Sequence, residues 1–599
     1  MSDLPHRRTL RGATVMKGPR VILESFDGER DRASFCFAEL VEVIAAYSLE
    51  QLLPALRRVE IAVTSGRHAA GFISYEAAPG LNPDLTTFPP GEFPLLWFGI
   101  FAKRLAVSPP PADAESAATY QTGNWQTSLS PERYAAAVAR VREYIAAGDT
   151  YQVNLTMRRK FSFAGDPALF YQDLCRSQRA PFCAYLDLER YKVLSASPEL
   201  FFRLGNGTLI TRPMKGTANR GRWYEEDEEA KRRLKANPKE RAENLMIVDL
   251  LRNDMGMVSS TGSVAVQSLF NMETLETVHQ MTSTISSRLE EGVGIVELFQ
   301  ALFPCGSVTG APKKRTMEII AKLEKSPRGL YTGCIGFISP GPEAVFSVAI
   351  RTIVIDTATG DAELGVGSGI TYDSRADAEY AECLAKGRFA HERRPEFQLI
   401  ETIRFEDGDG FFLLERHLER LRRSAAYFGF LLDSALIRKT LAVRSAPLFG
   451  SYKVRLLLSR NGTFTIQTEP VPADRPGTIL RAAFAGQRVD SRDPFLYHKS
   501  THRPQYVAEQ AKRPECVDLI FVNERDEVTE GASNNIVARI NGEMVTPSLE
   551  CGLLPGVFRE ELLERGEIRE LVITPEQLKS AGEIHLINSV RKWRRVKLV

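Results

Sequence analysis

Residues 212–217 and 243–254 decide how the chain is interpreted: they read Arg212-Pro213-Met214-Lys215-Gly216-Thr217 and Glu243-Asn244-Leu245-Met246-Ile247-Val248-Asp249-Leu250-Leu251-Arg252-Asn253-Asp254. The second stretch has helical character. Glu240 and Glu243 stand three residues apart ahead of its apolar run, so both lie on one face of the predicted helix.

A second Glu-x-x-Glu pair lies further along the chain. Glu379 and Glu382 follow Ser374, a typical N-cap residue, and Lys386 shares the helix face of Glu382. Four carboxylates converging from two helices would repel one another unless a cation held them, and hard oxygen ligands suit Mg²⁺. Two solvated amphipathic faces are the alternative interpretation.

Composition excludes several classes of protein. The chain has 599 residues, with 77 Lys+Arg against 75 Asp+Glu, and 43% of its residues are hydrophobic. A nearly neutral chain without a sustained basic run gives no electrostatic reason to expect a nucleic-acid partner. No window approaches ~18 consecutive apolar residues, so we expect no membrane span. The eight scattered cysteines and the absence of a signal peptide predict reduced thiols in a cytoplasmic enzyme.

The chain divides at a charged linker. Residues 1–124 mix short strand-like runs with few chemically informative residues, and residues 125–390 carry the motifs above. A helix is predicted from the N-cap Ser130 to the terminating Gly148. Residues 388–396 form the expected linker, and residues 397–599 form a second unit. Mixed helical and strand signals predict an α+β fold for both parts.

Further motifs accompany the glutamate pairs in a fixed order: Ser197-Pro198-Glu199, Arg212 to Thr217, Glu243 to Asp254, His279, Gly306-Ser307-Val308-Thr309-Gly310-Ala311-Pro312-Lys313 and Gly367-Ser368-Gly369-Ile370. In this order they resemble the chorismate-utilising enzyme family, which includes anthranilate synthase component I, aminodeoxychorismate synthase component I, and the isochorismate and salicylate synthases. The resemblance runs from about residue 15 to 390 and implies a large two-sheet α+β domain.

The resemblance implies a role for each matching residue. Mg²⁺ would be held by Glu240, Glu243, Glu379 and Glu382 and would bind the ring carboxylate of chorismate. The pyruvyl carboxylate would contact Arg351, Tyr331 and the backbone N–H groups around Gly367 and Gly369, where a glycine turn exposes donors. Other substrate-shell or metal-shell positions are matched by Gly216, Thr217, His279, Ser307 and Lys386. A surface ion pair, a core histidine and plain turns are the structural alternatives for single residues.

Two positions discriminate within the family. Gln152 stands where water-adding members carry a lysine, and a neutral amide cannot deprotonate water. Lys215 stands where anthranilate synthases have alanine, and a lysine there marks the aminodeoxychorismate-forming members. The resemblance then implies nucleophilic catalysis: Lys215 attacks ring C2 while the C4 hydroxyl leaves, and ammonia attacks C4. Glu199 is the acid/base candidate for the departing hydroxyl. A structural lysine or a simple substrate counter-ion is the alternative role for Lys215.

Ammonia needs a source, and the chain shows no glutaminase signature. A separate glutamine amidotransferase subunit is therefore expected, unless free ammonia suffices. Near the amino end, Leu23-Glu24-Ser25 resembles the segment that binds tryptophan in relatives.

The second unit carries its own set of motifs: Ile400-Glu401-Thr402-Ile403-Arg404, Arg416-His417-Leu418-Glu419-Arg420-Leu421, Tyr497-His498-Lys499-Ser500, Val528-Thr529-Glu530-Gly531-Ala532-Ser533-Asn534-Asn535-Ile536 and Gly552-Leu553-Leu554-Pro555-Gly556-Val557-Phe558-Arg559. The set resembles the fold-type IV pyridoxal-phosphate enzymes, which include aminotransferases and aminodeoxychorismate lyase. By itself the first part reads as a β-hairpin, with an apolar strand ending at Leu414, and an amphipathic helix.

This resemblance implies a pyridoxal 5'-phosphate site. Lys499 would form the Schiff base and Glu530 would pair with the pyridine nitrogen. The phosphate would be bound by Arg404, by the N–H groups of Val557 and Phe558 at a helix start, and by Ser589. A homodimer through this unit is expected, although a compressed first strand and an early carboxyl end depart from the family.

The motifs together predict a bifunctional enzyme of 4-aminobenzoate and folate biosynthesis. The first half would aminate chorismate to 4-amino-4-deoxychorismate, and the second would eliminate pyruvate. The alternatives are an anthranilate synthase component I that tolerates lysine, with a second half that is an aminotransferase or a non-catalytic pyridoxal-binding module.

Overall fold

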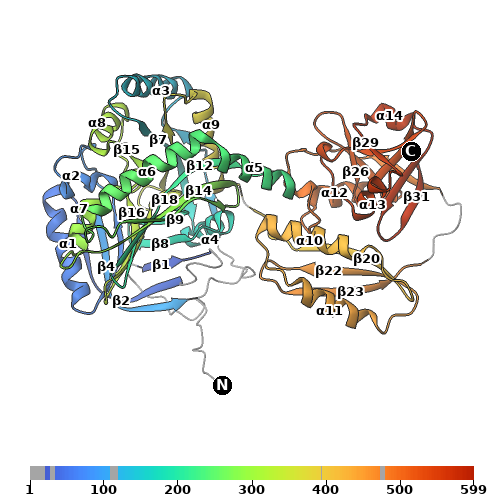
Figure 1. Ribbon diagram of the computed structural model, residues 1–599, viewed down its shortest axis with the longest axis horizontal. Helices are drawn as coiled ribbons and strands as arrows, with labels where there is room; N and C mark the ends of the chain where they lie inside the picture. Colours follow the sequence, from blue (N-terminus) through green and yellow to red (C-terminus); the bar gives the residue numbers. More distant parts are fainter. Residues whose placement is uncertain (1–19, 27–33, 108–118, 393, 473–478) are drawn as a thin grey trace. The chain divides into compact units, whose positions relative to one another are not determined.

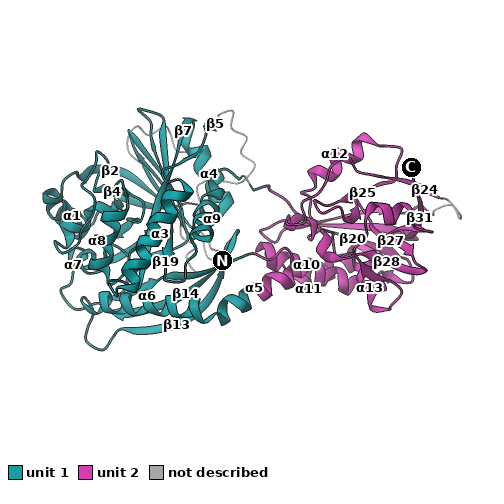
Figure 2. Ribbon diagram, turned by 90° about the horizontal axis from the view of Figure 1, so that it is seen from above, with its two compact units in different colours: residues 1–219, 231–394 teal, residues 220–230, 395–599 magenta. Residues whose placement is uncertain are grey.

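The computed structural model describes residues 20–26, 34–107, 119–392, 394–472 and 479–599. These residues form two compact units (Figures 1 and 2). Unit 1 lies within residues 1–219 and 231–394, and unit 2 within residues 220–230 and 395–599. The boundary between Arg394 and Pro395 falls inside the predicted linker, of which residue 393 lies outside the described residues.

Unit 1 is built on long antiparallel strands. Its described strands are β1 (Arg20–Glu24), β2 (Ser34–Ala46), β3 (His68–Ile73), β4 (Leu96–Val107), β5 (Tyr120–Thr122), β6 (Gln126–Thr127), β7 (Gln152–Gly165), β8 (Phe182–Leu188), β9 (Tyr191–Ser197), β10 (Leu200–Gly205), β11 (Thr208–Arg212), β12 (Met214–Asn219), β13 (Ala265–Thr274), β14 (Val278–Arg288), β15 (Gly310–Ala311), β16 (Cys334–Ser339), β17 (Glu343–Val348), β18 (Thr352–Asp356) and β19 (Asp361–Ile370). One part of the ladder runs β7-β19-β18-β9-β8-β1 and the other runs β2-β4-β3-β16-β17-β10-β11-β14. The β1–β2 pairing joins the two parts.

Helices cover the strands of unit 1. They are α1 (Leu49–Thr64), α2 (Ala78–Leu81), α3 (Pro131–Ala146), α4 (Pro167–Gln178), α6 (Pro238–Gly256), α7 (Ile295–Leu302), α8 (Lys313–Leu323) and α9 (Ala376–Lys386). The predicted helix after Ser130 is confirmed as α3. The Ser130 side chain caps this helix by accepting a hydrogen bond from Arg133 N. Ser374 is not the N-cap of α9, a position that Arg375 occupies; its hydroxyl instead accepts from Thr371 N.

Unit 2 contains two sheets. The smaller sheet, in the order β21-β20-β22-β23, comprises β20 (Leu399–Glu406), β21 (Gly410–Phe411), β22 (Ser451–Leu458) and β23 (Phe464–Pro470). The larger sheet comprises β24 (Leu480–Phe484), β25 (Asp518–Val522), β26 (Val528–Gly531), β27 (Asn535–Ile540), β28 (Glu543–Pro547), β29 (Arg569–Leu571), β30 (Ile584–Asn588) and β31 (Lys592–Leu598). Its helices are α10 (Leu414–Phe428), α11 (Ser434–Ser445), α12 (Pro504–Lys512), α13 (Val557–Glu564) and α14 (Pro575–Lys579). The apolar strand that was predicted to end at Leu414 is shorter than expected: β21 ends at Phe411, and Leu414 is the first residue of α10.

A short segment that follows β12 in the sequence packs inside unit 2. Arg220 and Asp227 form a buried ion pair at 2.7 Å, and the Arg220 guanidinium lies 4.3 Å from the Tyr427 ring centroid. The Tyr427 hydroxyl donates to the carbonyl of Gly221 at 2.7 Å. Residues 220–230 therefore belong to the second unit, although they precede its linker by more than a hundred residues; α5 (Tyr224–Ala236) begins within them.

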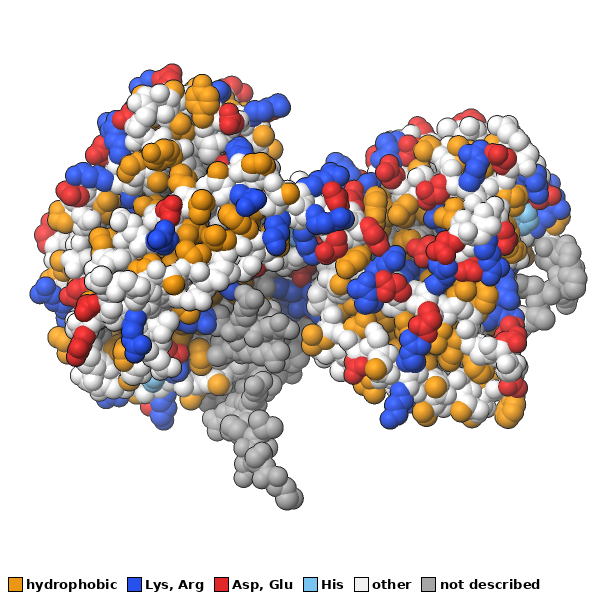
Figure 3. Space-filling model, viewed as in Figure 1, with side chains coloured by type: hydrophobic (Ala, Val, Ile, Leu, Met, Phe, Trp, Pro, Cys, Tyr) orange, Lys and Arg blue, Asp and Glu red, His pale blue; other side chains and the backbone are white. Residues whose placement is uncertain are grey.

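The surface agrees with the balanced composition. On the face shown in Figure 3, acidic and basic side chains lie interspersed over both units. Among the described residues, no helix is both long enough and apolar enough to cross a membrane.

Two candidate active sites

A cavity of about 180 Å³ in unit 1 collects most of the predicted chorismate-site residues. Its lining includes Glu199, Lys215, Gly216, Thr217, Glu240, Glu243, Ser307, Tyr331, Arg351, Gly367, Gly369, Glu379, Glu382 and Lys386. They come from β12, β19, α6, α9 and the turns between other strands. Residues nearly two hundred positions apart thus share one cavity, and their chemistry can act on one ligand.

Lys215 reaches into this cavity from β12. The β12–β14 register shifts between Met214 and Thr217, and Gly216 adopts a φ of 94°, so the strand is irregular where the lysine leaves it. Burial lowers the pKa of the Lys215 amine, while the neighbouring carboxylates of Glu243 and Glu199 oppose that shift. A larger share of this amine is therefore neutral, and hence nucleophilic, than for an exposed lysine.

Glu199 lies buried on the approach to β10. Burial raises the pKa of its carboxyl to about 7, and Ser307 and Lys215 oppose the shift. Its Oε1 atom is buried and has no hydrogen-bond partner. A carboxyl group with this pKa can either give or take a proton near neutral pH.

Gly367 and Gly369 are not in a turn, as the sequence suggested, but inside β19, opposite Thr156 and Asn154 of β7. Gly369 leaves room for two side chains, because a Cβ at this position would lie 1.9 Å from Gln152 Nε2 and 2.7 Å from Lys215 Nζ. Gln152 is buried, and its Oε1 has no partner. The structure therefore brings Gln152 beside Lys215, although Gln152 does not line the cavity.

The four glutamates line the cavity from two helices. α6 starts at the N-cap Asn237, whose side chain accepts hydrogen bonds from Lys239 N and Glu240 N. The position of this helix start determines which face of α6 carries Glu240 and Glu243. Burial and mutual repulsion raise the pKa of Glu240. On α9, Glu382 pairs with Lys386 at 2.6 Å, and Lys386 donates to the carbonyl of Gly367 at 3.0 Å.

The chemistry of this donor set fits a hard divalent cation, since Glu240, Glu243, Glu379 and Glu382 all offer carboxylate oxygens to the cavity. Within the described part of the chain, however, no three His, Cys, Asp or Glu side chains converge closely enough to hold an ion by themselves. Mg²⁺ commonly keeps several waters and uses one or two carboxylates together with ligand oxygens. The glutamates therefore suit an ion shared with water and substrate.

Arg351 contributes a cation to the lining of the same cavity. It has a φ of 51°, an unusual conformation for a non-glycine residue, and its guanidinium hydrogen-bonds to Gln178 Oε1. Burial lowers the pKa of Arg351 to about 10, so it stays protonated at neutral pH. His279 does not line the cavity; it is buried on β14, where Nδ1 contacts the Thr274 hydroxyl at 3.2 Å. Glu24, in the predicted tryptophan segment, accepts from the Tyr171 hydroxyl at 2.8 Å.

A second cavity, of about 440 Å³, lies within unit 2. Its lining includes the predicted Lys499, Glu530, Val557, Phe558 and Ser589. The backbone carbonyl of Lys499 accepts from Ile400 N at 2.9 Å, which ties the lysine to β20. Burial, with Arg420 and Arg503 nearby, lowers the pKa of Lys499 to about 7. This amine is therefore prepared to attack a carbonyl and later to carry a proton.

Glu530 is fixed on β26 by three donors. They are the Tyr506 hydroxyl at 3.1 Å, Leu554 N at 3.1 Å and Asn535 Nδ2 at 3.4 Å. Burial raises the pKa of Glu530 to about 7. A protonated ring nitrogen placed here would compensate the carboxylate, so the residues present fit a pyridine-containing cofactor.

The phosphate arginine expected from the sequence is in the wrong place. Arg404 does not line the cavity, because its guanidinium donates to Glu406 and to the carbonyl of Val590. Arg420 lines it instead and donates to the carbonyl of Pro555 at 3.2 Å, just ahead of α13. The sequence could have pointed to Arg420, because it is a charged residue on the apolar side of the predicted helix, three positions after His417.

Arg420 is held by a buried network. Glu401 accepts from Arg420 Nη2 at 2.7 Å and contacts His417 Nδ1 at 2.6 Å. Burial alone would raise the pKa of Glu401, but Arg420 and His417 lower it to about 2. The stabilisation that this pair contributes is therefore present above the unfolded pKa near 4.5 and is lost as the pH falls from there toward 2.

Replacing Glu401 by glutamine should lower the free energy of unfolding of unit 2 by ~3–5 kcal/mol at neutral pH, because it leaves the Arg420 charge buried without a carboxylate. Chemical denaturation measures the change. Glu406→Gln on the same strand is the matched control, since its partly exposed pair with Arg404 should contribute less than ~1 kcal/mol. Equal losses in the two variants would contradict this account of the network.

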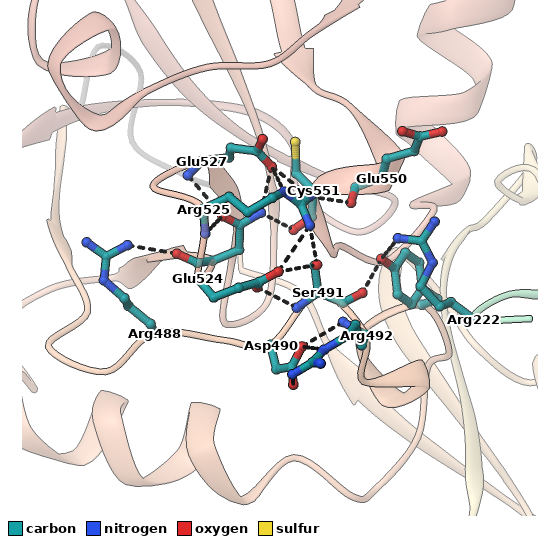
Figure 4. A network of polar contacts seen from close by, with 12 residues as sticks. Arg222, Arg488, Asp490, Ser491, Arg492, Glu524, Arg525, Glu527, Glu550 and Cys551 are labelled. Carbon is teal, nitrogen blue, oxygen red and sulfur yellow. Dashed lines mark hydrogen bonds and ion pairs between the residues drawn. The ribbon is translucent and has the colours of Figure 1, made fainter. Parts of the chain in front are cut away.

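A polar network supports the segment that precedes Lys499 (Figure 4). The Tyr497 hydroxyl donates to the carbonyl of Ser491 at 2.7 Å and contacts Arg222 Nη1 at 3.4 Å. Ser491 in turn donates to Glu524, and Arg525 donates to the Ser491 hydroxyl at 2.6 Å. Trp223 packs on Tyr497 with ring centroids 5.1 Å apart. Residues 220–230 are thus part of the support of the lysine segment.

Comparisons with known proteins match one protein family to each of the two units. The family model of chorismate binding enzymes matches residues 6–392, so the chain belongs to that family. The model of class IV amino-transferases matches residues 398–599, which form a domain of that type. Unit 1 also shares the fold of anthranilate synthase component I from Streptococcus pneumoniae, with a TM-score of 0.50 and 24% identity over 65% of this chain and 94% of that one.

Curated relatives include enzymes of two activities. Aminodeoxychorismate synthase component 1 of Escherichia coli is 42% identical over 265 residues, 44% of this chain and 58% of that protein. Anthranilate synthase component 1 of Aquifex aeolicus is 40% identical over 265 residues, 44% of this chain and 53% of that protein. The matches span somewhat more than half of these relatives. Overall identity hardly separates the two activities, so the choice between them depends on individual residues.

Proposed function

We propose that unit 1 aminates chorismate to 4-amino-4-deoxychorismate, and that unit 2 eliminates pyruvate from this product to give 4-aminobenzoate, a precursor of folate. The observation that supports the first step best is the buried Lys215 amine, whose pKa is lowered, in a cavity lined by carboxylates and Arg351. An amine whose pKa is shifted by burial and by specific charged neighbours inside a cavity is a candidate for a functional role.

Lys215 acts as the nucleophile in this proposal. Its neutral amine forms a bond to ring C2 while the two conjugated ring double bonds shift and the C4 hydroxyl leaves, protonated by Glu199. Ammonia then attacks C4, the two double bonds shift back, and the C2–N bond to Lys215 breaks, which returns its electron pair to the amine. Gln152 beside Lys215 cannot activate water, which disfavours hydroxylation at C2.

The polar groups around Lys215 orient the substrate. Mg²⁺ shared among Glu240, Glu243, Glu379 and Glu382 would neutralise the ring carboxylate. Arg351 would pair with the pyruvyl carboxylate, with Tyr331 beside it. A separate glutamine amidotransferase would supply the ammonia, as the designation "component 1" of the relatives suggests.

Unit 2 would hold pyridoxal 5'-phosphate with Lys499, Glu530, Arg420, Ser589 and the start of α13. When bound, this cofactor withdraws electrons from a carbon attached to the substrate nitrogen. Lys499, with its pKa near 7, would remove the proton from the ring carbon that bears the amino group, and the enolpyruvyl group would leave as pyruvate. An amino-acid aminotransferase is the alternative for this domain, because the class IV family carries that name.

The decisive experiment combines purified protein with chorismate, Mg²⁺, pyridoxal phosphate and an ammonium salt. Chromatography with mass detection should find 4-aminobenzoate and pyruvate in equal amounts. Glutamine without a partner subunit should yield neither. Formation of 2-aminobenzoate would instead identify an anthranilate synthase, and accumulation of 4-amino-4-deoxychorismate would leave the second half without its proposed activity.

The pH profile of amination should reveal Glu199. With a pKa of about 7, this carboxyl is protonated below pH 7 and can donate to the leaving hydroxyl, so kcat/KM should fall about tenfold per pH unit above 7. Glu199→Gln should lower the rate and remove this limb. Glu76→Gln is the matched control, because burial also raises the pKa of Glu76 to about 7 although it does not line the cavity. Persistence of the limb in Glu199→Gln would exclude this role.

A further inference from the structure

Tyr497 and His498, the two residues before Lys499, are buried aromatic side chains. The backbone carbonyl of Lys499 is tied to β20, whereas these two rings pack on other parts of unit 2. In a close-packed interior a buried ring occupies one position, and its backbone follows that position. The groups that hold the two rings therefore determine where the Lys499 side chain starts.

One of these groups is Trp223, which packs on the ring of Tyr497. The two ring centroids lie 5.1 Å apart, at an interplanar angle of 37°. The Arg222 guanidinium lies 4.6 Å from the Trp223 ring centroid and contacts the Tyr497 hydroxyl at 3.4 Å. Aromatic pairs and cation–π contacts of this kind are favourable and depend on orientation. Trp223 and Arg222 together restrain the Tyr497 side chain.

Tyr427 on α10 connects the same segment to the second ring. The ring centroids of Tyr427 and His498 lie 4.3 Å apart. The Tyr427 hydroxyl donates to the carbonyl of Gly221 at 2.7 Å, and Arg220 Nη2 donates to the carbonyl of Tyr427 at 2.7 Å. Residues 220–223 thus reach both aromatic rings that precede the lysine, one directly and the other through α10.

The segment that makes these contacts is held in one conformation by its own hydrogen bonds. Asp227 accepts from Arg220 Nε at 2.7 Å and from Gly221 N at 2.9 Å, and its side chain is only 1% exposed. Charge-assisted bonds to a buried carboxylate are stronger than bonds between neutral groups. A segment closed in this way can hold its neighbours in place.

We propose that Trp223 is a positioning residue for Lys499, so that the second cavity depends on a segment from the first half of the sequence. Trp223 does not line that cavity and acts through Tyr497. It lies within the residues that match the chorismate binding enzymes, and outside those that match the class IV amino-transferases. The inference rests on the proposed function of unit 2 to the extent that Lys499 holds the cofactor.

The test measures the binding of pyridoxal phosphate to the full chain and the visible circular dichroism of each bound cofactor. This signal reports how the protein orients the cofactor, independently of turnover. Trp223→Ala should raise the Kd for pyridoxal phosphate about tenfold and at least halve the signal. The kcat for pyruvate release should fall about 10- to 100-fold, with KM changed less than about threefold, because misplacing a reacting group slows chemistry more than binding.

Two variants at neighbouring positions separate positioning from a general loss of packing. Trp223→Phe keeps a ring against Tyr497 and should restore each value to within about threefold of the unaltered chain. Tyr224→Ala is the matched control: Tyr224 lies on the same segment, but its ring packs against the Arg422 guanidinium at 5.4 Å. It should change each value less than about twofold. Equal changes in Trp223→Ala and Tyr224→Ala, or no recovery in Trp223→Phe, overturn the inference.

Tyr427→Phe provides a test that leaves all the rings in place. It removes only the hydroxyl that donates to Gly221, so it loosens the same segment without emptying the core. The Kd for pyridoxal phosphate should rise about threefold, and amination by unit 1 should stay within about twofold of normal. If Trp223→Ala does not fold, a Kd and a dichroism signal unchanged in Tyr427→Phe still overturn the inference.

Failure of the lyase proposal gives a different result. If the unaltered chain binds pyridoxal phosphate but releases no pyruvate, the proposed elimination is wrong, whereas a Kd and a dichroism signal that depend on Trp223 retain the positioning role. If pyruvate forms and no quantity responds to Trp223→Ala, the elimination stands and the inference fails. If the unaltered chain binds no pyridoxal phosphate, both fail.

Discussion

Replacing Lys215 by alanine should reduce the conversion of chorismate to 4-amino-4-deoxychorismate by on the order of 10³-fold, with chorismate binding changed little. The reason is that the variant removes the nucleophile, whereas the glutamates and Arg351 that would hold the two carboxylates remain. Consumption of chorismate in the presence of Mg²⁺ and an ammonium salt, followed by mass detection, measures the effect.

The arginine variant separates a nucleophile from a counter-ion. Lys215→Arg keeps the positive charge but cannot lose its proton near neutral pH, so it should be as inactive as Lys215→Ala if the amine forms a bond to the ring. Mass spectrometry of protein quenched during turnover without ammonia should detect an adduct on the peptide that contains Lys215. Substantial activity in Lys215→Arg, or amination by Lys215→Ala at the normal rate, would sink the covalent role.

Replacing Lys499 by alanine should abolish release of pyruvate, again by on the order of 10³-fold or more, while amination continues. The chain would then accumulate 4-amino-4-deoxychorismate, because the cavity that contains Lys215 lies in unit 1 and keeps all its residues. Chromatography of the products over time distinguishes accumulation of this intermediate from loss of both activities.

Lys512→Ala is the matched control for Lys499. Lys512 lies in the same unit, on α12, with a side chain 65% exposed, and it does not line the cavity. It should leave both activities within about twofold of the unaltered chain. Continued production of 4-aminobenzoate by Lys499→Ala would mean that unit 2 serves another purpose, such as association or binding.

In both cavities, burial shifts the pKa values of carboxyl groups and amines in opposite directions. It lowers the pKa of Lys215 and of Lys499, and it raises the pKa of Glu199 and of Glu530 to about 7. Because desolvation disfavours whichever form is charged, a buried amine and a buried carboxyl both move toward neutral pH. Each cavity thus contains groups that can exchange protons under ordinary conditions.

Local patterns predicted much of this architecture. The N-cap Ser130 and the following proline predicted α3, because a helix start depends on nearby backbone donors and a side chain that satisfies them. Spacing within α6 and α9 predicted which glutamates share a face. The predicted site residues of the first half all line one cavity, Gln152 and His279 excepted.

Other features depend on segments that meet only in the folded chain. Gly367 and Gly369 resembled a turn, but their strand neighbours on β7 and the approach of Gln152 and Lys215 are contacts across more than 150 residues. Arg404 resembled the phosphate ligand because it stands in the motif, yet Glu406 and Val590 hold it away from the cavity. A single strand carries no information about which partner will engage its side chain.

The sequence by itself determined the order of the motifs, the helices that present the glutamates, and the identity of Lys215 and Lys499 as the amines to test, since these depend on residue type and short spacing. Only the tertiary structure decided that Arg420, and not Arg404, lines the second cavity, and that residues 220–230 pack within the second unit. Burial, hydration and charge pairing are properties of the assembled core, where side chains distant in sequence exclude water from one another.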